Sequence, residues 1–288
     1  MNAVSCLEEA WRSPQSARRF HYRVWAPPAA RRLLILIHGF GEHGGRYDPI
    51  ARALAESGIL VIAPDLWGHG RSEGGRGDLG SVSECVEELR RFADSVALPL
   101  VPGEETYALY GHSFGGLTAI AWACRDPQRV RRAVIQSPLL DLGFPVPRWK
   151  TGAGRWLARW WPAAPLPMDL DAAMLSHDSR VVEAYRSDPL VHNRMSAGTY
   201  RSILQARDEA FERAGELRMP VLLLCGAEDR IVSVDAATRW FNRLACEKRC
   251  VVFPGCYHEL HHEAAYPDLV RLIVDWILGT DHVAPDGV

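Results

Sequence analysis

A serine flanked by glycines constrains what this chain can fold into more than any other feature. Residues 111–115 read G-H-S-F-G, follow an apolar run at 106–110 and precede a helical pattern at 114–124. Glycines on both sides let the backbone turn sharply, and such a turn between a strand and a helix pushes the central hydroxyl outwards. The pattern therefore predicts a strand–turn–helix unit that presents Ser113 as an accessible nucleophile.

The same five-residue pattern occurs a second time, at residues 70–74. This copy lies in a stretch rich in glycine and charge, residues 68–80, with no strand before it and no helix after it. The pattern exposes a hydroxyl only within that flanking structure. We therefore interpret Ser72 as a loop residue.

The composition is that of a globular protein with a sizeable core: 48% of the residues are hydrophobic and the net charge is −2. This charge provides no basic field for nucleic acid. Neither a membrane-spanning run of 18 apolar residues nor a secretory signal is expected. The seven cysteines are an odd number, which favours reduced thiols over disulfides or a metal site. We expect a cytoplasmic protein without bound metal.

Apolar runs alternate with amphipathic runs along most of the chain. Candidate strands occupy residues 21–26, 33–37, 59–63, 107–110, 133–136, 221–225 and 250–253. Candidate helices occupy residues 46–57, 82–97, 114–124, 236–244 and 267–278. Short, continuous apolar strands that alternate with helices predict an α/β fold with a mostly parallel sheet covered by helices on both faces.

The alternation breaks between residue 141 and about residue 213, in a segment rich in proline and tryptophan. We expect a core of residues 1–140 and 206–288, interrupted by a helical cap at 141–205. An apolar stripe recurs there at helical spacing and contains Trp149, Ala153, Trp156 and Trp160. A helix with such a stripe either packs on the core or lies in a lipid interface. An apolar cap suits a substrate with one long acyl chain.

Polar residues follow two late strands, where a parallel sheet would bring them to the edge that carries Ser113. A serine nucleophile needs a base, and the base needs a carboxylate that fixes its tautomer. Asp229 after the strand at 221–225 is the candidate acid, and His258 after the strand at 250–253 is the candidate base. Glu228 and Asp235 compete for the role of acid, and His261 and His262, expected at the surface or at a helix start, compete for that of base.

The oxyanion that forms during ester cleavage needs two preset N–H donors. One candidate is the backbone N–H of Phe114, directly after the nucleophile. The other is the backbone N–H of Phe40, in the glycine-rich turn at 38–41 that ends the strand at 33–37.

The same turn also begins a G-x-G-x-x-G pattern at residues 39–44, with Asp65 about twenty residues further on. This pattern is typical of a dinucleotide site. Its third glycine lies outside the helical pattern that starts near Arg46, and the oxyanion turn explains the same glycines. A nicotinamide-dependent oxidoreductase therefore stays a remote alternative, and we expect no cofactor.

Five segments of this sequence resemble the α/β-hydrolases, and within them the monoacylglycerol lipase and lysophospholipase group. They are residues 38–47 (HGFGEHGGRY), 65–72 (DLWGHGRS), 137–141 (SPLLD), 188–191 (DPLV) and 255–261 (GCYHELH). The resemblance implies an α/β-hydrolase fold with a helical cap, the triad Ser113, Asp229 and His258, and oxyanion donors at Phe40 and Phe114.

The activity that the resemblance implies is hydrolysis of carboxylic esters of single-chain lipids, foremost monoacylglycerols, through an acyl-enzyme. A lysophospholipase, a general carboxylesterase or an acyltransferase would use the same machinery. The group more often has methionine where this chain has Phe114 and alanine where it has Phe40, which narrows the expected acyl channel. The implied partners are a lipid ester and, through the cap, a transient contact with a membrane or micelle surface.

Overall fold

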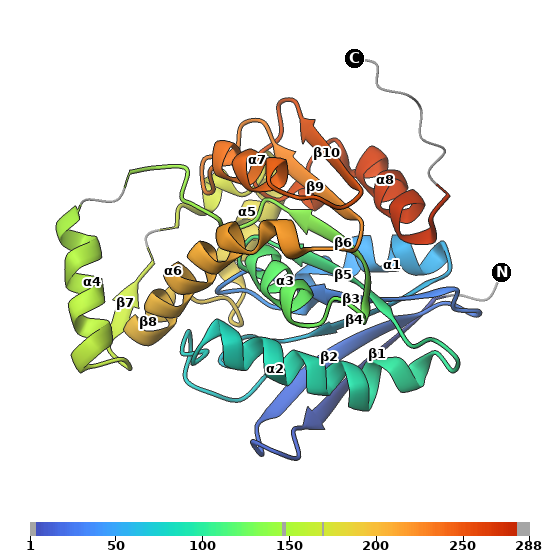
Figure 1. Cartoon of the computed structure of the whole chain (residues 1–288), viewed down its shortest axis with the longest axis horizontal. Helices are drawn as coiled ribbons and strands as arrows, with labels where there is room; N and C mark the ends of the chain where they lie inside the picture. Colours follow the sequence, from blue (N-terminus) through green and yellow to red (C-terminus); the bar gives the residue numbers. More distant parts are fainter. Residues whose placement is uncertain (1–3, 146–147, 169, 281–288) are drawn as a thin grey trace.

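The computed structural model describes residues 4–145, 148–168 and 170–280. Its centre is an eight-stranded sheet with the strand order β1-β2-β4-β3-β5-β6-β9-β10 (Figure 1). In that order the strands are Ser5–Arg12, Arg19–Ala26, Ile59–Pro64, Arg32–Ile37, Tyr107–His112, Val130–Gln136, Val221–Gly226 and Lys248–Phe253.

The six strands from β4 to β10 in this order are parallel, whereas β1 and β2 add antiparallel pairs at one edge. Strands β4, β5 and β9 are buried along their whole length, as a sheet covered on both faces requires. The predicted α/β architecture is confirmed. Strand β1 was not predicted, because an exposed edge strand that contains Glu8 and Glu9 carries no apolar pattern.

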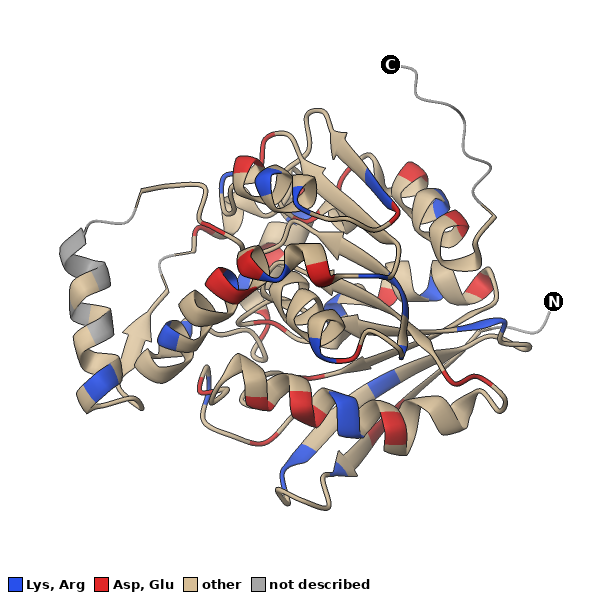
Figure 2. Cartoon of the chain, in the orientation of Figure 1, with Lys and Arg blue, Asp and Glu red and all other residues tan. Residues whose placement is uncertain are grey.

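Helices cover both faces of the sheet. Helices α1 (Asp48–Glu56) and α8 (Tyr266–Leu278) pack on one face. Helices α2 (Val82–Phe92), α3 (Phe114–Arg125), α6 (Ala197–Glu212) and α7 (Val234–Asn242) pack on the other. Figure 2 shows acidic residues followed by basic residues along α2, where Arg90 pairs with Glu87 and Arg91 with Glu88. Such mixed charge is typical of a solvated helix face.

The segment between β6 and β9 is mostly helical. It contains α4 (Arg148–Trp160), α5 (Ser179–Ser187), α6 and a small antiparallel pair formed by β7 (Pro165–Pro167) and β8 (Arg194–Ser196). Helix α6 crosses the expected boundary between residues 205 and 206 and buries Ile203, Ala206 and Ala210 in the main core. The division into a core at 1–140 and 206–288 and a cap at 141–205 therefore stays a prediction.

Helix α4 lies at the outer edge of the molecule, beside α6 (Figure 1). Trp156 and Trp160 of the predicted stripe are 63% and 68% exposed. The side chains of Trp149 and Ala153 lie outside the described residues. No helix in the described ranges has the length and apolar character needed to span a bilayer.

Candidate active site

Ser113 occupies the sharp turn between β5 and α3, as the sequence predicts. Its φ of 55° and ψ of −116° form a backbone conformation that residues other than glycine rarely adopt. The turn is held from both sides, because the Ser113 N–H donates to the Gln136 carbonyl (3.0 Å) and the Leu139 N–H donates to the Ser113 carbonyl (3.0 Å). Tertiary hydrogen bonds thus sustain a strained residue at a place typical of function.

Close backbone approach explains both glycines of the turn. A Cβ on Gly111 would lie 2.3 Å from the carbonyl oxygen of Gly115. A Cβ on Gly115 would lie 2.0 Å from the carbonyl oxygen of Ile37. Both contacts are with backbone atoms, so neither position accepts a larger residue without a shift of a core strand.

His258 and Asp229 form a buried pair at the ends of β10 and β9. Nδ1 of His258 lies 2.7 Å from Oδ2 of Asp229. The other carboxylate oxygen of Asp229 accepts hydrogen bonds from the N–H groups of Ile231 (2.9 Å) and Val232 (3.0 Å). These two bonds hold the carboxylate in a fixed orientation toward His258. The acid and the base predicted from the sequence are thus in direct contact.

The electrostatics of this pair favour the ionised carboxylate. Burial works against charge on both groups. The Asp229 carboxylate outweighs burial at His258, whose pKa lies above its usual 6.5. In turn, His258 and the two backbone donors hold the pKa of Asp229 below its usual range. The imidazolium form of His258 is therefore stabilised by a charge placed next to it in advance.

The loop that carries His258 is fastened beside the turn of Ser113. The His258 ring lies 4.5 Å, centroid to centroid, from the ring of His112, the residue that precedes Ser113. The Ser137 hydroxyl donates to the His258 carbonyl (3.2 Å). His258 thus lies at the same sheet edge as the nucleophile turn.

The two residues expected to supply oxyanion donors are neighbours. Phe114 is the first residue of α3, where an N–H has no acceptor within the helix. Phe40 follows β3, and its ring meets that of Phe114 edge to face at 5.4 Å. The N–H of His192, from the segment after α5, donates to the carbonyl of Gly41 (2.8 Å) and ties the segment between β6 and β9 to this turn.

The competing residues from the sequence analysis lie elsewhere or are differently engaged. Glu228 and Asp235 are exposed. His262 Nδ1 contacts the Glu259 carboxylate at 2.8 Å. Of the two places expected for His261, the surface is wrong, because the residue is 3% exposed and stacks on Tyr47. A helix start agrees with the structure, since His261 lies in a 3-10 helix at Leu260–His262.

The second serine pattern has a structural role. Ser72 lies in a turn, where its hydroxyl donates to the Asp65 carbonyl (2.6 Å) and accepts from the His21 N–H (2.9 Å). The first bond closes the loop after β4, and the second ties this loop to β2. This agrees with the interpretation of Ser72 as a loop residue.

Carboxylates of the chain occupy the glycine-rich loop that resembles a dinucleotide site. The Gly39 N–H donates to Glu42 (2.6 Å), and the Gly44 N–H donates to Asp65 (2.9 Å). Asp65 is buried and also accepts from the Arg71 N–H (2.9 Å). In a dinucleotide site, backbone amides of this loop would bind the pyrophosphate and the carboxylate would bind a ribose hydroxyl. Here these groups are bonded to other groups of the protein, so the geometry favours an oxyanion turn over a dinucleotide site.

A buried ion network beside the site was not predicted from the sequence. Arg46 binds Glu42 and makes two hydrogen bonds to Glu259, the residue after His258, at 2.6 and 2.8 Å. Nitrogen atoms of His261 and His262 lie within 4.8 Å of this carboxylate. Because Arg46 engages both oxygens of Glu259, the cluster is an ion network and a poor set of metal ligands.

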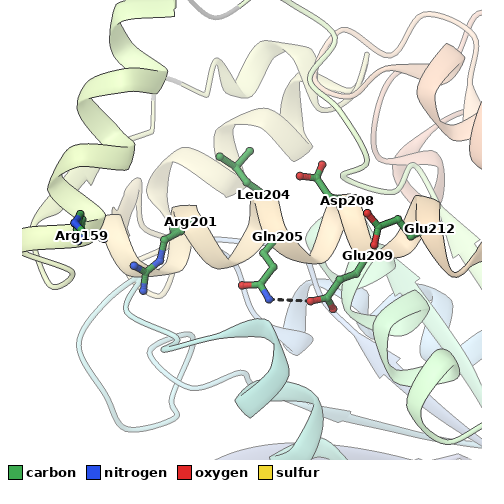
Figure 3. Close-up of a pocket in the computed structure, with 7 residues that line it drawn as sticks. All are labelled: Arg159, Arg201, Leu204, Gln205, Asp208, Glu209 and Glu212. Carbon is green, nitrogen blue, oxygen red and sulfur yellow. Dashed lines mark hydrogen bonds between the residues drawn. The ribbon is translucent and has the colours of Figure 1, made fainter.

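A surface cleft of about 620 Å³ lies between α4 and α6 (Figure 3). Arg159 of α4 and Arg201, Asp208 and Glu209 of α6 line it. None of the candidate site residues contributes to this cleft, and its charged lining does not suit an acyl chain.

The sequence matches the family described as serine aminopeptidase, S33, over residues 28–265. The chain belongs to this family. The match spans the turn of Ser113 and the loops of Asp229 and His258, and the strand order described above is that of the α/β-hydrolase fold.

Similar proteins place this hydrolase in the monoacylglycerol lipase-like group. A monoacylglycerol lipase from Mycolicibacterium smegmatis is 32% identical over 90% of this chain and 93% of the relative. The crystal structure of Paleococcus ferrophilus monoacylglycerol lipase matches with a TM-score of 0.84 and 31% identity, over 91% of this chain and 99% of that one. The resemblance stated from the sequence is confirmed.

An uncharacterized abhydrolase domain-containing protein from Dictyostelium discoideum is 33% identical over 88% of this chain. The chain spans only 27% of that relative's length. The hydrolase unit thus also occurs within a much longer protein.

Proposed function

We propose that this hydrolase cleaves monoacylglycerols to a fatty acid and glycerol, with Ser113, Asp229 and His258 as its catalytic triad. The observation that carries the proposal is the buried contact of His258 with Asp229 beside the strained turn of Ser113. Relatives named monoacylglycerol lipase, matched along nearly their whole length, support the choice of substrate.

The proposed reaction begins with attack of the Ser113 hydroxyl on the ester carbonyl. His258 accepts the hydroxyl proton on Nε2, because its Nδ1 is engaged by Asp229. The N–H groups of Phe40 and Phe114 stabilise the oxyanion. His258 then protonates the departing glycerol, and water activated by the same ring releases the fatty acid from Ser113.

We further propose that the hydrolase works in the cytoplasm and touches lipid surfaces transiently through α4. Trp156, Trp160 and Trp161 expose more than half of their surface at the outer end of the cap, and the Arg159 guanidinium lies 5.5 Å from the Trp160 ring. Tryptophan beside a basic side chain suits the boundary between water and lipid. Such a contact would bring the site close to a substrate that partitions into membranes.

The two serine patterns provide a matched test. We expect Ser113→Ala to lower kcat on a monoacylglycerol by at least about 10⁴-fold and to abolish labelling by a fluorophosphonate. Ser72→Ala removes two structural hydrogen bonds, so it should lower the free energy of unfolding by about 1–2 kcal/mol and leave kcat within about twofold.

Substantial hydrolysis by a folded Ser113→Ala variant would refute the assignment of the nucleophile. The substrate is tested with a panel of a monoacylglycerol, a lysophospholipid and a short ester, with and without an alcohol acceptor. Preference for the lysophospholipid, or transfer to the alcohol, would replace the proposed activity by one of the alternatives on the same machinery.

A further inference from the structure

The side chain of Gln136 lies fully buried between two imidazole rings next to the candidate base. Its amide nitrogen is 3.0 Å from Nδ1 of His112 and 3.1 Å from Nδ1 of His261. Its amide oxygen accepts a hydrogen bond from the Tyr110 hydroxyl at 2.5 Å. The amide nitrogen has two N–H donors, and each of them therefore faces one of the two rings.

This arrangement determines where each ring carries its proton. An amide nitrogen only donates, so Nδ1 of His112 and Nδ1 of His261 must both present a lone pair. A neutral imidazole that accepts at Nδ1 carries its hydrogen on Nε2. Neither ring then has a free lone pair with which to take a proton.

The His112 ring lies beside the ring of the candidate base, and the His261 ring lies beside that of His112. His112 lies 4.5 Å from His258 and 5.2 Å from His261, centroid to centroid. Gln136 also accepts the Ser113 N–H with its backbone carbonyl. One residue thus contacts the nucleophile turn through its backbone and both neighbouring imidazoles through its side chain.

We propose that Gln136 is a positioning residue that locks His112 and His261 as Nε2–H tautomers, so that the proton taken from Ser113 goes to His258 and to no neighbouring ring. The inference rests on the proposed function for its role in the reaction. The tautomers themselves follow from hydrogen-bond geometry and can be measured without any activity.

The surroundings of both rings are consistent with neutral imidazoles. Burial, followed by the nearby His258, lowers the pKa of His112 to about 3, although the carboxylates of Glu42, Glu259 and Asp229 oppose the shift. For His261, burial again lowers the pKa well below its usual value. The charged or titratable groups that face His261 are His262, His112, Glu259 and Arg46, and Tyr47 stacks on its ring.

The direct test is ¹⁵N spectroscopy of the whole protein labelled in its histidine rings. Signals of the two rings are identified by their loss in His112→Gln and in His261→Gln. We expect both rings to show a hydrogen on Nε2 and no titration between pH 5 and pH 9. A hydrogen on Nδ1 of either ring, or titration of either ring in that range, would overturn the proposal.

Gln136→Glu tests the consequence for catalysis. A carboxylate at the same place only accepts, so both rings should shift their hydrogen to Nδ1 and free Nε2 as a competing base. We expect kcat on a water-soluble ester to fall about tenfold, with KM changed by less than about twofold.

Gln136→Met is the control for size, because it fills the space without the amide donors. It should lose the uniform Nε2–H signals and retain the folded circular dichroism spectrum. Unchanged tautomers and unchanged kcat in a folded Gln136→Glu variant would contradict the proposal. If Ser113→Ala stays active while the tautomers are as expected, the proposed function fails and the tautomer assignment stands.

Discussion

The sheet edge that carries Ser113 and the outer helix α4 are held in place by very different means. At the sheet edge, Ser113 follows the buried strand β5, which pairs with β3 on one side and β6 on the other, and His258 follows β10, which pairs with the buried strand β9. Helix α4 is held mainly through α6 and a small apolar cluster of Ala158, Ala164 and Ala197. A close-packed site offers little room for change, whereas the outer helix tolerates it.

The two regions also differ in how far their aromatic side chains are buried. Near the site, Phe114 is fully buried and packs on Phe40. In α4, most of the surface of Trp156 and of Trp160 is exposed to solvent. Apolar residues that serve packing and apolar residues that serve contact with a surface thus occur in separate parts of the chain.

Adding one methyl group in each region should have opposite effects on stability. Gly115→Ala would place its Cβ 2.0 Å from the Ile37 carbonyl oxygen, so we expect a loss of more than about 4 kcal/mol in the free energy of unfolding. Gly152→Ala in α4 meets no atom within 4 Å and should gain about 0.5–1 kcal/mol from helix propensity. Urea unfolding measures both, and equal effects of the two substitutions would contradict the contrast.

The pH dependence of the reaction should depend on the charge of His258 and not on the residues of α4. His258 must be neutral to accept a proton, and its pKa lies above 6.5 because of Asp229. The rate kcat/KM on a water-soluble ester should therefore fall, tenfold per pH unit, as the pH drops below a midpoint above 6.5.

Trp160→Ser in the cap should leave that midpoint unchanged. A midpoint below 6.5 in the unmodified protein would contradict the charge assignment.

The raised pKa of His258 also affects stability. The contribution of protonated His258 to the free energy of unfolding is fully present below pH 6.5 and is lost as the pH rises through its pKa in the folded protein. The contribution of Asp229, whose pKa is lowered, is present above about pH 3.8 and is lost as the pH falls through its pKa in the folded protein.

The smallest expected effect concerns the exposed tryptophans. The double change Trp156→Ser and Trp160→Ser removes apolar surface without disturbing a buried contact, so hydrolysis of a water-soluble ester should stay within about twofold. Hydrolysis of a monoacylglycerol in phospholipid vesicles should fall about threefold to tenfold, because the lipid contact is weakened. Leu7→Ser, which alters another exposed apolar residue, on β1, is the matched control. An equal loss in the control would argue against a role of α4 at lipid surfaces.

Local patterns in the sequence were sufficient to predict those site residues whose position depends on one short segment. The glycines around Ser113 are readable because a tight strand-to-helix turn forces them, and Asp229 and His258 are readable because each directly follows an apolar strand. Strand β1 escaped notice, since its pairing with β2 leaves charged side chains in solvent. The boundary of the predicted cap is equally hard to place. Helix α6 packs in the main core, but the first part of its sequence lies in the predicted cap segment.

The α/β fold, the family and the residues proposed for the triad could be inferred from the sequence, because they depend on hydrophobic period, glycine geometry and chain order. Which ring contacts which partner became known only from the folded arrangement. The burial of His261, the ion pair of Arg46 with Glu259 and the amide of Gln136 between two imidazoles join residues up to 213 positions apart. No local pattern encodes such contacts, because they arise only when separate strands bring their loops to one edge of the sheet.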